Sequence, residues 1–267
     1  MFVGLGDERM TGDWLQTYRR VPSPRVRLVC FPHAGAGATV YRRWSMLVPA
    51  DVEVVAVCYP GRQHRLAEPF SASIAALATG AAAEIARLDP APLALFGHSM
   101  GAVVAFETTV RLERGYGLLP RRLFVSGRWP PGHRPATDAP PDPEDDAALL
   151  DHLKRLGNKQ LDLFAIAEMR ELLLGVLRAD YRLLADHRPS RPTRTITSVT
   201  GYCGDADPGC AVDDVAAWRS ATGGSFRLRV FPGDHFYLDP LAAEVVHDVL
   251  DCLGLTVGKS IGGTAVS

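Results

Sequence analysis

Residues 93–108, LALFGHSMGAVVAFET, place one apolar run directly before Gly-His-Ser-Met-Gly and a second directly after it. A strand that turns at once into a helix must fold back within about one residue, which holds the residue at the turn in strained dihedrals. Glycine at positions 97 and 101 removes side chains that would otherwise clash with the adjacent strand and helix. The stretch therefore predicts a strand, a tight turn carrying Ser99 and a helix, with Ser99 at the carboxyl edge of an open α/β sheet.

The rest of the chain alternates strand-like and helix-like segments. Continuous apolar runs rich in β-branched residues are typical of strands buried on both faces, and they occur at 26–31, 52–57, 93–96, 123–125, 196–200 and 228–231. Helical patterns occur at 71–88, 102–114, 212–222 and 240–253. The alternation predicts an α/β fold in which a mostly parallel central sheet is flanked by helices on both sides.

One segment interrupts this alternation between two expected strands. A proline- and acid-rich loop at 129–146 precedes helical patterns at 147–156, 161–165 and 168–184, with no strand between them. We expect a helical insertion at about 129–187, which either packs on the core as an inert addition or forms a lid over the site. A single domain is expected over 14–253, and the glycine-rich end at 254–267 is expected to be disordered and outside the fold.

Charge and composition narrow the possible partners. The 267 residues carry a formal net charge of −1, so nothing favours nucleic acid or an anionic membrane. We expect no signal sequence, and no apolar run approaches the roughly 18 residues that span a bilayer. Five scattered cysteines indicate reduced thiols in a cytoplasmic protein, and the close pair Cys203 and Cys210 lacks the further ligands that a metal site needs.

A serine nucleophile near neutral pH needs a general base that is oriented by a carboxylate. In such a sheet the partners follow the serine in the order acid, then histidine. Of the eight histidines, His235 alone has both this order and a place directly after the last expected strand. His98 adjoins the serine, but we expect the turn to point it away. His33 follows the first expected strand, and the rest are expected to be solvated or to cap helices: His64, His133, His152, His187 and His247.

The acid is expected in the loop CGDADPGC, which follows the strand expected from residue 196. Asp205 and Asp207 are both candidates, and either could instead only cap the turn before Pro208. Acyl transfer also needs donors for the developing oxyanion. The Met100 amide, at the start of a helix, is one candidate, and the Ala34 amide in the loop CFPHAGAGA is the other, although that loop could be an ordinary glycine-rich turn.

Seven stretches occur in the order CFPHAGAGA, YPGRQHRLAEP, FGHSMGAVVAFE, LFVSGRWPP, LRADYRLL, GDADP and FPGDHFYL. Together they resemble the type II thioesterases, the free-standing α/β-hydrolases that accompany modular polyketide synthases and nonribosomal peptide synthetases. The resemblance covers roughly residues 14–253. It implies a catalytic triad of Ser99, Asp207 and His235, with oxyanion amides at Ala34 and Met100.

The resemblance further implies hydrolysis of acyl thioesters on the phosphopantetheine arm of acyl or peptidyl carrier proteins. Such an enzyme removes aberrant or stalled acyl groups through an acyl-enzyme intermediate, in the cytoplasm, with no metal and no cofactor beyond the arm that its substrate carries. Arg62, Arg65 and Arg128 are candidates for a basic rim that attracts an acidic carrier, although each could instead be an ordinary solvated or loop-bracing arginine. Two positions depart from the family pattern, Ala36 in place of a glycine in the early loop and Asn158 in the insertion.

Two other classes of function compete with this interpretation. A carboxylesterase or lipase for free small-molecule esters would use the same triad, but it would not explain YPGRQHRLAEP or FPHAGAGA. A non-catalytic scaffold would keep the fold and lose a member of the triad, whereas Ser99, Asp207 and His235 are all present.

Overall fold

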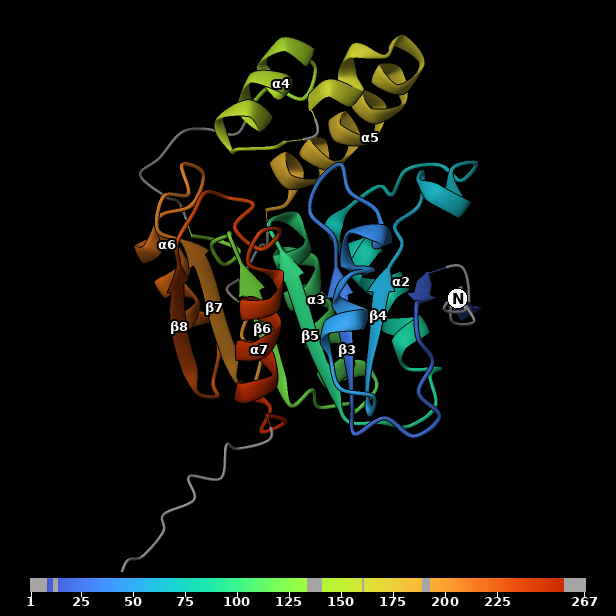
Figure 1. Cartoon of the computed structure of the whole chain (residues 1–267), viewed down its shortest axis with the longest axis vertical. Coiled ribbons are helices and arrows are strands. Elements are labelled where there is room, and N and C mark those ends of the chain that lie inside the picture. The colour runs from blue at the N-terminus through green and yellow to red at the C-terminus, as the bar shows by residue number, and fades with distance from the viewer. Residues whose placement is uncertain (1–8, 12–13, 134–140, 160, 189–192, 257–267) are drawn as a thin grey trace, which may run out of the picture.

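A computed structural model describes residues 9–11, 14–133, 141–159, 161–188 and 193–256. In this part of the chain an eight-stranded sheet has the order β1-β2-β4-β3-β5-β6-β7-β8 (Figure 1). All neighbours from β4 to β8 in this order are parallel, whereas β1 and β2 are antiparallel additions at one edge. The strands are β1 (Arg9–Thr11), β2 (Leu15–Thr17), β3 (Val26–Phe31), β4 (Val52–Val57), β5 (Leu93–His98), β6 (Arg122–Ser126), β7 (Val199–Gly204) and β8 (Phe226–Phe231).

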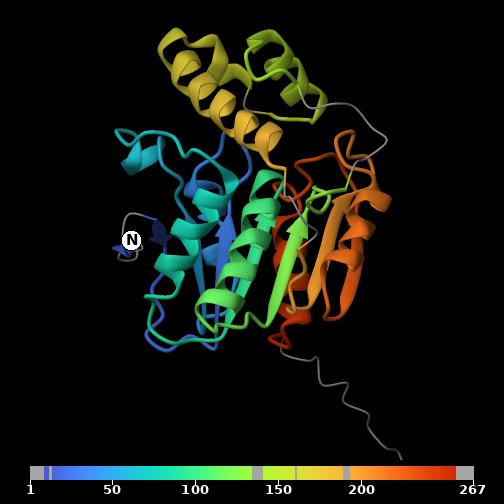
Figure 2. The ribbon, with the colours of Figure 1, turned by 180° about the vertical axis from the view of Figure 1, so that it is seen from behind.

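Helices cover both faces of the sheet (Figures 1 and 2). One hydrophobic cluster joins the sheet to α2 (Ile74–Ile85), α3 (Met100–Gly115), α6 (Val212–Ala216) and the 3-10 helix η4 (Ala217–Ala221). A second cluster joins the opposite face to α1 (Trp44–Leu47) and α7 (Ala242–Cys252). Alternate residues of β3 enter the two clusters, as the period of a strand requires. The predicted α/β fold with a mostly parallel sheet between helices is confirmed.

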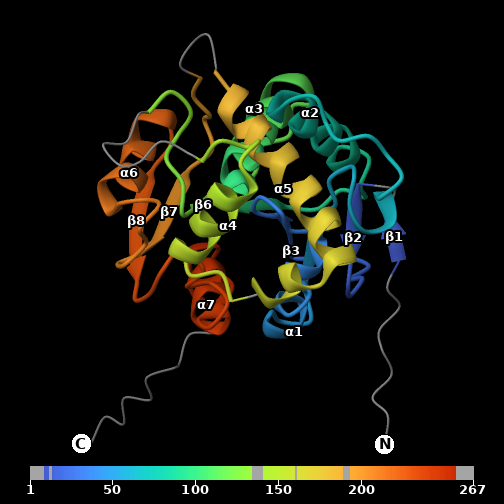
Figure 3. The same ribbon diagram turned by 90° about the horizontal axis from the view of Figure 1, so that it is seen from above.

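Three further helices lie across the carboxyl ends of the strands (Figures 1 and 3). They are α4 (Asp146–Arg155), the 3-10 helix η3 (Leu161–Ala165) and α5 (Ala167–Asp186), and together they form what we call the insertion. The α4 helix ends on Gly157, whose φ of +87° supplies the left-handed residue of a Schellman cap. The Asn158 amide completes that cap by donating to the Leu153 carbonyl at 3.0 Å, so asparagine fits here without needing a glycine's backbone freedom.

The first half of the chain also contains two short 3-10 helices. The 3-10 helices η1 (Ala38–Tyr41) and η2 (Gln63–Arg65) follow β3 and β4. The α2 helix begins after Ser73, whose hydroxyl accepts from the Ala76 amide at 3.0 Å. The short antiparallel strands β1 and β2 carry too little pattern to be found in the sequence, because each has only 3 residues.

The strand expected at 196–200 is wrong in its position, because β7 begins at Val199. The carboxylate of Glu113, near the end of α3, accepts from the Thr197 amide at 3.0 Å and the Ile196 amide at 3.2 Å. A side chain therefore satisfies these amides, which lie before the strand, and the Ile196 side chain is 67% exposed.

The expected end of the folded region at residue 253 is also wrong. Leu255 is buried in the second hydrophobic cluster. Its amide donates to the Leu250 carbonyl at 2.8 Å across Gly254, whose φ is +68°, so the end of α7 is a second Schellman cap. The remaining part of the expected disordered segment, 257–267, lies outside the described residues.

Candidate active site

Ser99 lies at the tight turn between β5 and α3, with φ 54° and ψ −119°. A Cβ at position 97 would lie 2.1 Å from the Gly101 carbonyl oxygen, and a Cβ at position 101 would lie 2.0 Å from the Phe31 carbonyl oxygen. Only glycine fits at these two positions, as the sequence predicted. The Ser99 amide donates to the Ser126 carbonyl at 2.8 Å, which ties the strained residue to the neighbouring strand β6.

The loops after β7 and β8 bring an aspartate and a histidine together. His235 Nδ1 lies 2.7 Å from Asp207 Oδ2, and the Asp207 side chain is fully buried. The other oxygen of Asp207 accepts from the Gly209 amide at 2.8 Å, so the carboxylate is held in one orientation. Asp205 instead accepts from the Gly233 amide at 2.9 Å and braces the turn before the histidine. Of the two candidate acids, only Asp207 therefore contacts His235.

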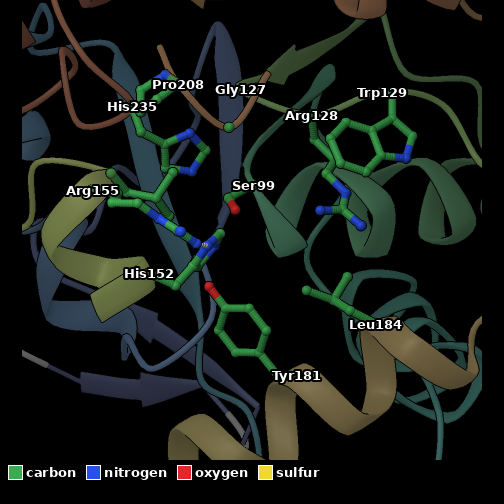
Figure 4. Close-up of a pocket in the computed structure, with 12 residues that line it drawn as sticks. Ser99, Gly127, Arg128, Trp129, His152, Arg155, Tyr181, Leu184, Pro208 and His235 are labelled. Atoms are coloured by element: carbon green, nitrogen blue, oxygen red, sulfur yellow. Dashed lines mark hydrogen bonds between the residues drawn. The ribbon is translucent and has the colours of Figure 1, made fainter. Parts of the chain in front are cut away.

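Ser99 and His235 line one cavity beneath the insertion (Figure 4). Its walls come from two sources. The loops of the sheet supply Gly127, Arg128, Trp129, Pro208 and Gly209, and the insertion supplies His152, Arg155, Leu156, Tyr181 and Leu184. The sequence did not single out these insertion residues, because no motif marks which face of an amphipathic helix lies over a site.

A second cavity lies between the loop after β3 and the insertion, and His33 and Phe236 are among the residues that line it. The loop contributes residues 33–37, and the insertion contributes Leu153, Phe164 and Leu177 among others. The two cavities share the loop after β8, which lines the first through His235 and the second through Phe236, and the insertion lines both.

The loop after β3 forms a turn in which the Ala36 amide donates to the His33 carbonyl at 3.1 Å. Gly35 has the positive φ, +79°, that the third residue of a type II turn needs. Ala36 follows the turn and needs no such freedom, so its departure from the family pattern leaves the loop intact. Among the hydrogen bonds of the described residues, none uses the amide of Ala34 or of Met100 as donor.

His98 does not point away from the site as expected, but lies against the catalytic loops. Its ring centroid is 4.7 Å from that of His235 and 5.9 Å from that of His33. His98 Nδ1 bonds to Ser126 Oγ at 2.8 Å. Burial, followed by the nearby His235, lowers the pKa of His98 well below its usual value, so the ring is neutral and packs beside His235.

The expected basic rim of Arg62, Arg65 and Arg128 is wrong. Arg65 is buried, stacks over Trp14 at 4.2 Å and pairs with Glu68. Arg62 is buried against the insertion, as described below. Arg128 lines the cavity of Ser99 and stacks over Trp129 at 3.9 Å, and burial lowers its pKa to about 10. The sequence located these arginines at loops but could not show that apolar and aromatic neighbours would enclose them.

The cysteines of the chain are all unpaired, and four of the five are buried. Burial raises the pKa of Cys203 to about 11. In the described part of the chain no three histidine, cysteine or acidic side chains come together as a metal site would require. Over the same residues no helix has the length and apolar character needed to cross a bilayer.

A parallel sheet with a nucleophile elbow after β5, an acid after β7 and a histidine after β8 defines an α/β-hydrolase. Comparison with known proteins narrows this class. Residues 26–251 match the family described as thioesterase domain. The chain is 39% identical over 254 residues to thioesterase PikA5 of Streptomyces venezuelae, covering 93% of this chain and 88% of that one.

Two solved structures give the same result. BorB, described as the type II thioesterase from the borrelidin biosynthetic cluster, superposes with a TM-score of 0.78 at 34% identity, covering 90% of this chain and 97% of that one. YbtT, a type II thioesterase from the yersiniabactin pathway, gives 0.80 at 29% identity, covering 90% and 98%. The chain belongs to the thioesterase family, and it is an enzyme that acts on thioesters.

Proposed function

We propose that this enzyme hydrolyses acyl thioesters on the phosphopantetheine arm of carrier proteins, and so removes aberrant or stalled acyl groups from a polyketide or nonribosomal peptide assembly line. The observation that carries the proposal is the 2.7 Å contact of the buried Asp207 with His235, which lines one cavity together with Ser99. The similarity to type II thioesterases of such pathways supports the choice of substrate.

The proposed reaction has two steps. His235 Nε2 accepts the hydroxyl proton of Ser99 as Oγ attacks the thioester carbon, while Asp207 holds the imidazole through Nδ1 and stabilises its positive charge. The oxyanion accepts hydrogen bonds from the amides of Ala34 and Met100. The carbon–sulfur bond then breaks, and the thiol leaves with the proton from His235. In the second step His235 takes a proton from water as the water oxygen attacks the acyl-enzyme carbonyl. The bond between this carbon and Ser99 Oγ then breaks, Oγ takes the proton from His235, and the free acid leaves.

The two cavities suggest how one substrate is accommodated. The arm of a carrier is long and flexible, so the enzyme needs a channel to Ser99 more than a large docking face. The cavity at the loop after β3 and the cavity at Ser99 are both lined by the loop after β8 and by the insertion, so one can receive the arm and the other the acyl group. We propose action in the cytoplasm, where such a carrier would be loaded, with no metal and no cofactor other than the arm of the substrate.

The test compares one acyl group on a carrier protein, on free pantetheine and as a simple oxygen ester. The proposal predicts that kcat/KM is highest for the carrier-bound thioester and lowest for the oxygen ester, and that Ser99→Ala abolishes all three. Equal rates on the carrier and on pantetheine at every salt concentration would show that the carrier is not recognised. Preference for the oxygen ester would instead favour a carboxylesterase.

A further inference from the structure

A buried aspartate of the insertion contacts the loop that carries the Ala34 amide. Asp180, in the second half of α5, accepts from the Gly35 amide at 2.8 Å. The same carboxylate pairs with both terminal nitrogens of Arg62, each at 2.7 Å. The Asp180 side chain is 1% exposed and that of Arg62 is 7% exposed. The pair therefore lies between the insertion and the core of the enzyme.

These contacts fix the turn at several points. Arg62 also donates to the Ala36 carbonyl at 3.0 Å. His33 Nδ1 lies 3.0 Å from the Ala34 carbonyl oxygen, which can only accept, so the ring donates to it. The Ala34 carbonyl and the Gly35 amide belong to one peptide group, and this group is therefore held at both ends, by His33 and by Asp180. The turn bond from the Ala36 amide to the His33 carbonyl holds the preceding peptide group, which contains the Ala34 amide.

The α5 helix also limits the turn sterically. A Cβ at position 35 would lie 3.0 Å from the Leu177 side chain, one turn of α5 before Asp180. Burial alone would lower the pKa of Arg62, but the Asp180 carboxylate raises it above its usual value. Since the Asp180 and Arg62 side chains are both buried, removing either partner leaves the other as an uncompensated buried charge.

We propose that Asp180 is a positioning residue, which through Gly35 and Arg62 holds the Ala34 amide where it can donate to the oxyanion. The oxyanion site is then complete only when the second half of α5 is seated on the turn. This inference rests on the proposed function and adds a residue that does not touch substrate. Motion that admits substrate is thereby confined to α4, η3 and the first half of α5.

The experiment compares Asp180→Ala, Asp180→Asn and a control, Asp146→Asn. Asp146, in α4, pairs with Arg178 of α5 at 2.6 Å, and these two side chains are 31% and 27% exposed. This ion pair is therefore much less buried than that of Asp180 and Arg62. Each variant is assayed for kcat and KM with one acyl-pantetheine. Each is also titrated with an alkyl boronic acid, which forms an anionic adduct with an active serine and so reports on the oxyanion site.

We expect Asp180→Ala to lower kcat by about 10²- to 10³-fold, the effect of losing one oxyanion donor. KM should change by no more than about threefold, and affinity for the boronic acid should fall with kcat, because the loss is confined to the anionic state. Asp180→Asn keeps an acceptor for the Gly35 amide and should lose about tenfold. Asp146→Asn should match the parent in all three quantities.

An Asp180→Ala enzyme with unchanged kcat and unchanged boronic acid affinity would overturn the proposal. A raised KM with unchanged kcat would also overturn it, since Asp180 would then serve substrate binding. If Asp180→Ala does not fold, Asp180→Asn and Arg62→Lys decide the matter, because each keeps part of the pair. The parent enzyme's own hydrolysis and its loss in Ser99→Ala test the proposed function separately, so either claim can fail while the other stands.

Discussion

The β5 strand and the insertion meet at the same cavity, yet they are built differently. Every residue of β5 is buried, whereas η3 has no buried residue and α4 buries only Leu149 and Leu153 along its length. The sheet therefore fixes the reacting groups because its strand is packed on all sides. Most of the insertion, in contrast, packs against the rest of the enzyme through one helix face only. Segments with few buried contacts open most easily, so the sheet supplies geometry and the insertion supplies access.

The α5 helix belongs to both regions. Its first residues, 167–173, are exposed or half-buried, whereas the buried residues of α5 begin at Leu174 and include Asp180 and Tyr181. The boundary between the rigid and the adjustable part of the enzyme thus lies within a continuous helix. The two parts of α5 differ in how deeply their side chains are buried, although they follow one another in a single helix.

If the sheet supplies the reacting groups, loss of the nucleophile should have the largest effect. Ser99→Ala should lower the hydrolysis rate by on the order of 10⁶-fold, because the remaining groups cannot form the acyl-enzyme. The turn should survive, since its shape depends on the flanking glycines. Steady-state hydrolysis of an acyl-pantetheine, with thermal unfolding as the control for folding, measures this. A variant that retains near-parental turnover would remove Ser99 from the mechanism.

The two neighbouring aspartates give the next largest effect. Asp207→Asn should cost roughly 10⁴-fold in kcat, because the amide cannot hold His235 in the required tautomer. Asp205→Asn is the matched control two positions away, and it weakens only a bond to the Gly233 amide. Its kcat should fall by less than about tenfold. The reverse order of the two losses would make Asp205 the catalytic acid.

Substitution of two glycines of α3 tests how tightly the turn around Ser99 is packed. Gly101→Ala places a Cβ 2.0 Å from the Phe31 carbonyl oxygen, so the variant should lose more than about 3 kcal/mol of unfolding free energy or fail to fold. Gly115→Ala, in the last turn of the same helix, meets nothing within 4 Å and should be neutral or stabilising by up to about 1 kcal/mol. Urea unfolding of both variants compares them, and equal stabilities would mean that the turn can relax.

Hydrogen exchange should reveal the boundary within α5. Amides of α4, η3 and the first half of α5 should exchange at least about 100-fold faster than those of β5. Amides at 177–184 should be protected nearly as well as the sheet, because Asp180 and its neighbours are buried there. Uniform protection of the whole insertion would show a rigid addition, and uniform fast exchange would show that α5 moves as one unit.

The smallest effect concerns pH. Burial lowers the pKa of His33 to about 4 from an ordinary value of 6.5, so the unfolded chain binds this proton more tightly. Stability contributed by the neutral ring is present above about pH 6.5 and is lost as the pH falls toward 4. His33→Asn should therefore reduce the loss of unfolding free energy between pH 7 and pH 4.5, by on the order of 1 kcal/mol. An unchanged pH slope would show that the ring is solvated.

The parts of the fold that the sequence predicted have strong local causes. The elbow around Ser99 was predictable because two glycines, an apolar strand and a helix leave little choice of path. Asp207 and His235 were predictable from chain order and from the family resemblance, and the residues themselves left Asp205 open. Only the contacts that the two carboxylates make in the structure separate Asp205 from Asp207, because the side chains diverge within one short loop.

The parts that the sequence missed depend on long-range contacts. Nothing local to Arg62 shows that Asp180, 118 positions away, lies opposite it. The carboxylate of Glu113, which belongs to α3, accepts from the Thr197 amide before β7 begins. The residue types at 196–200 contain no information about this contact. Leu255 is in the core because the cap at the end of α7 directs the chain back toward the second hydrophobic cluster. The glycine-rich composition of 254–267 had instead favoured disorder.

The central claim is that Ser99, activated by His235 and Asp207, carries the acyl group. Its most direct test is to inactivate the enzyme in steps with an organophosphonate that labels activated serines, and to measure the remaining hydrolysis of a carrier-bound acyl thioester at each step. We predict a single label on the peptide that contains Ser99, activity that falls in proportion to it, and negligible labelling of Asp207→Asn. Complete labelling of Ser99 with hydrolysis intact, or loss of activity with the label on another residue, would contradict the account.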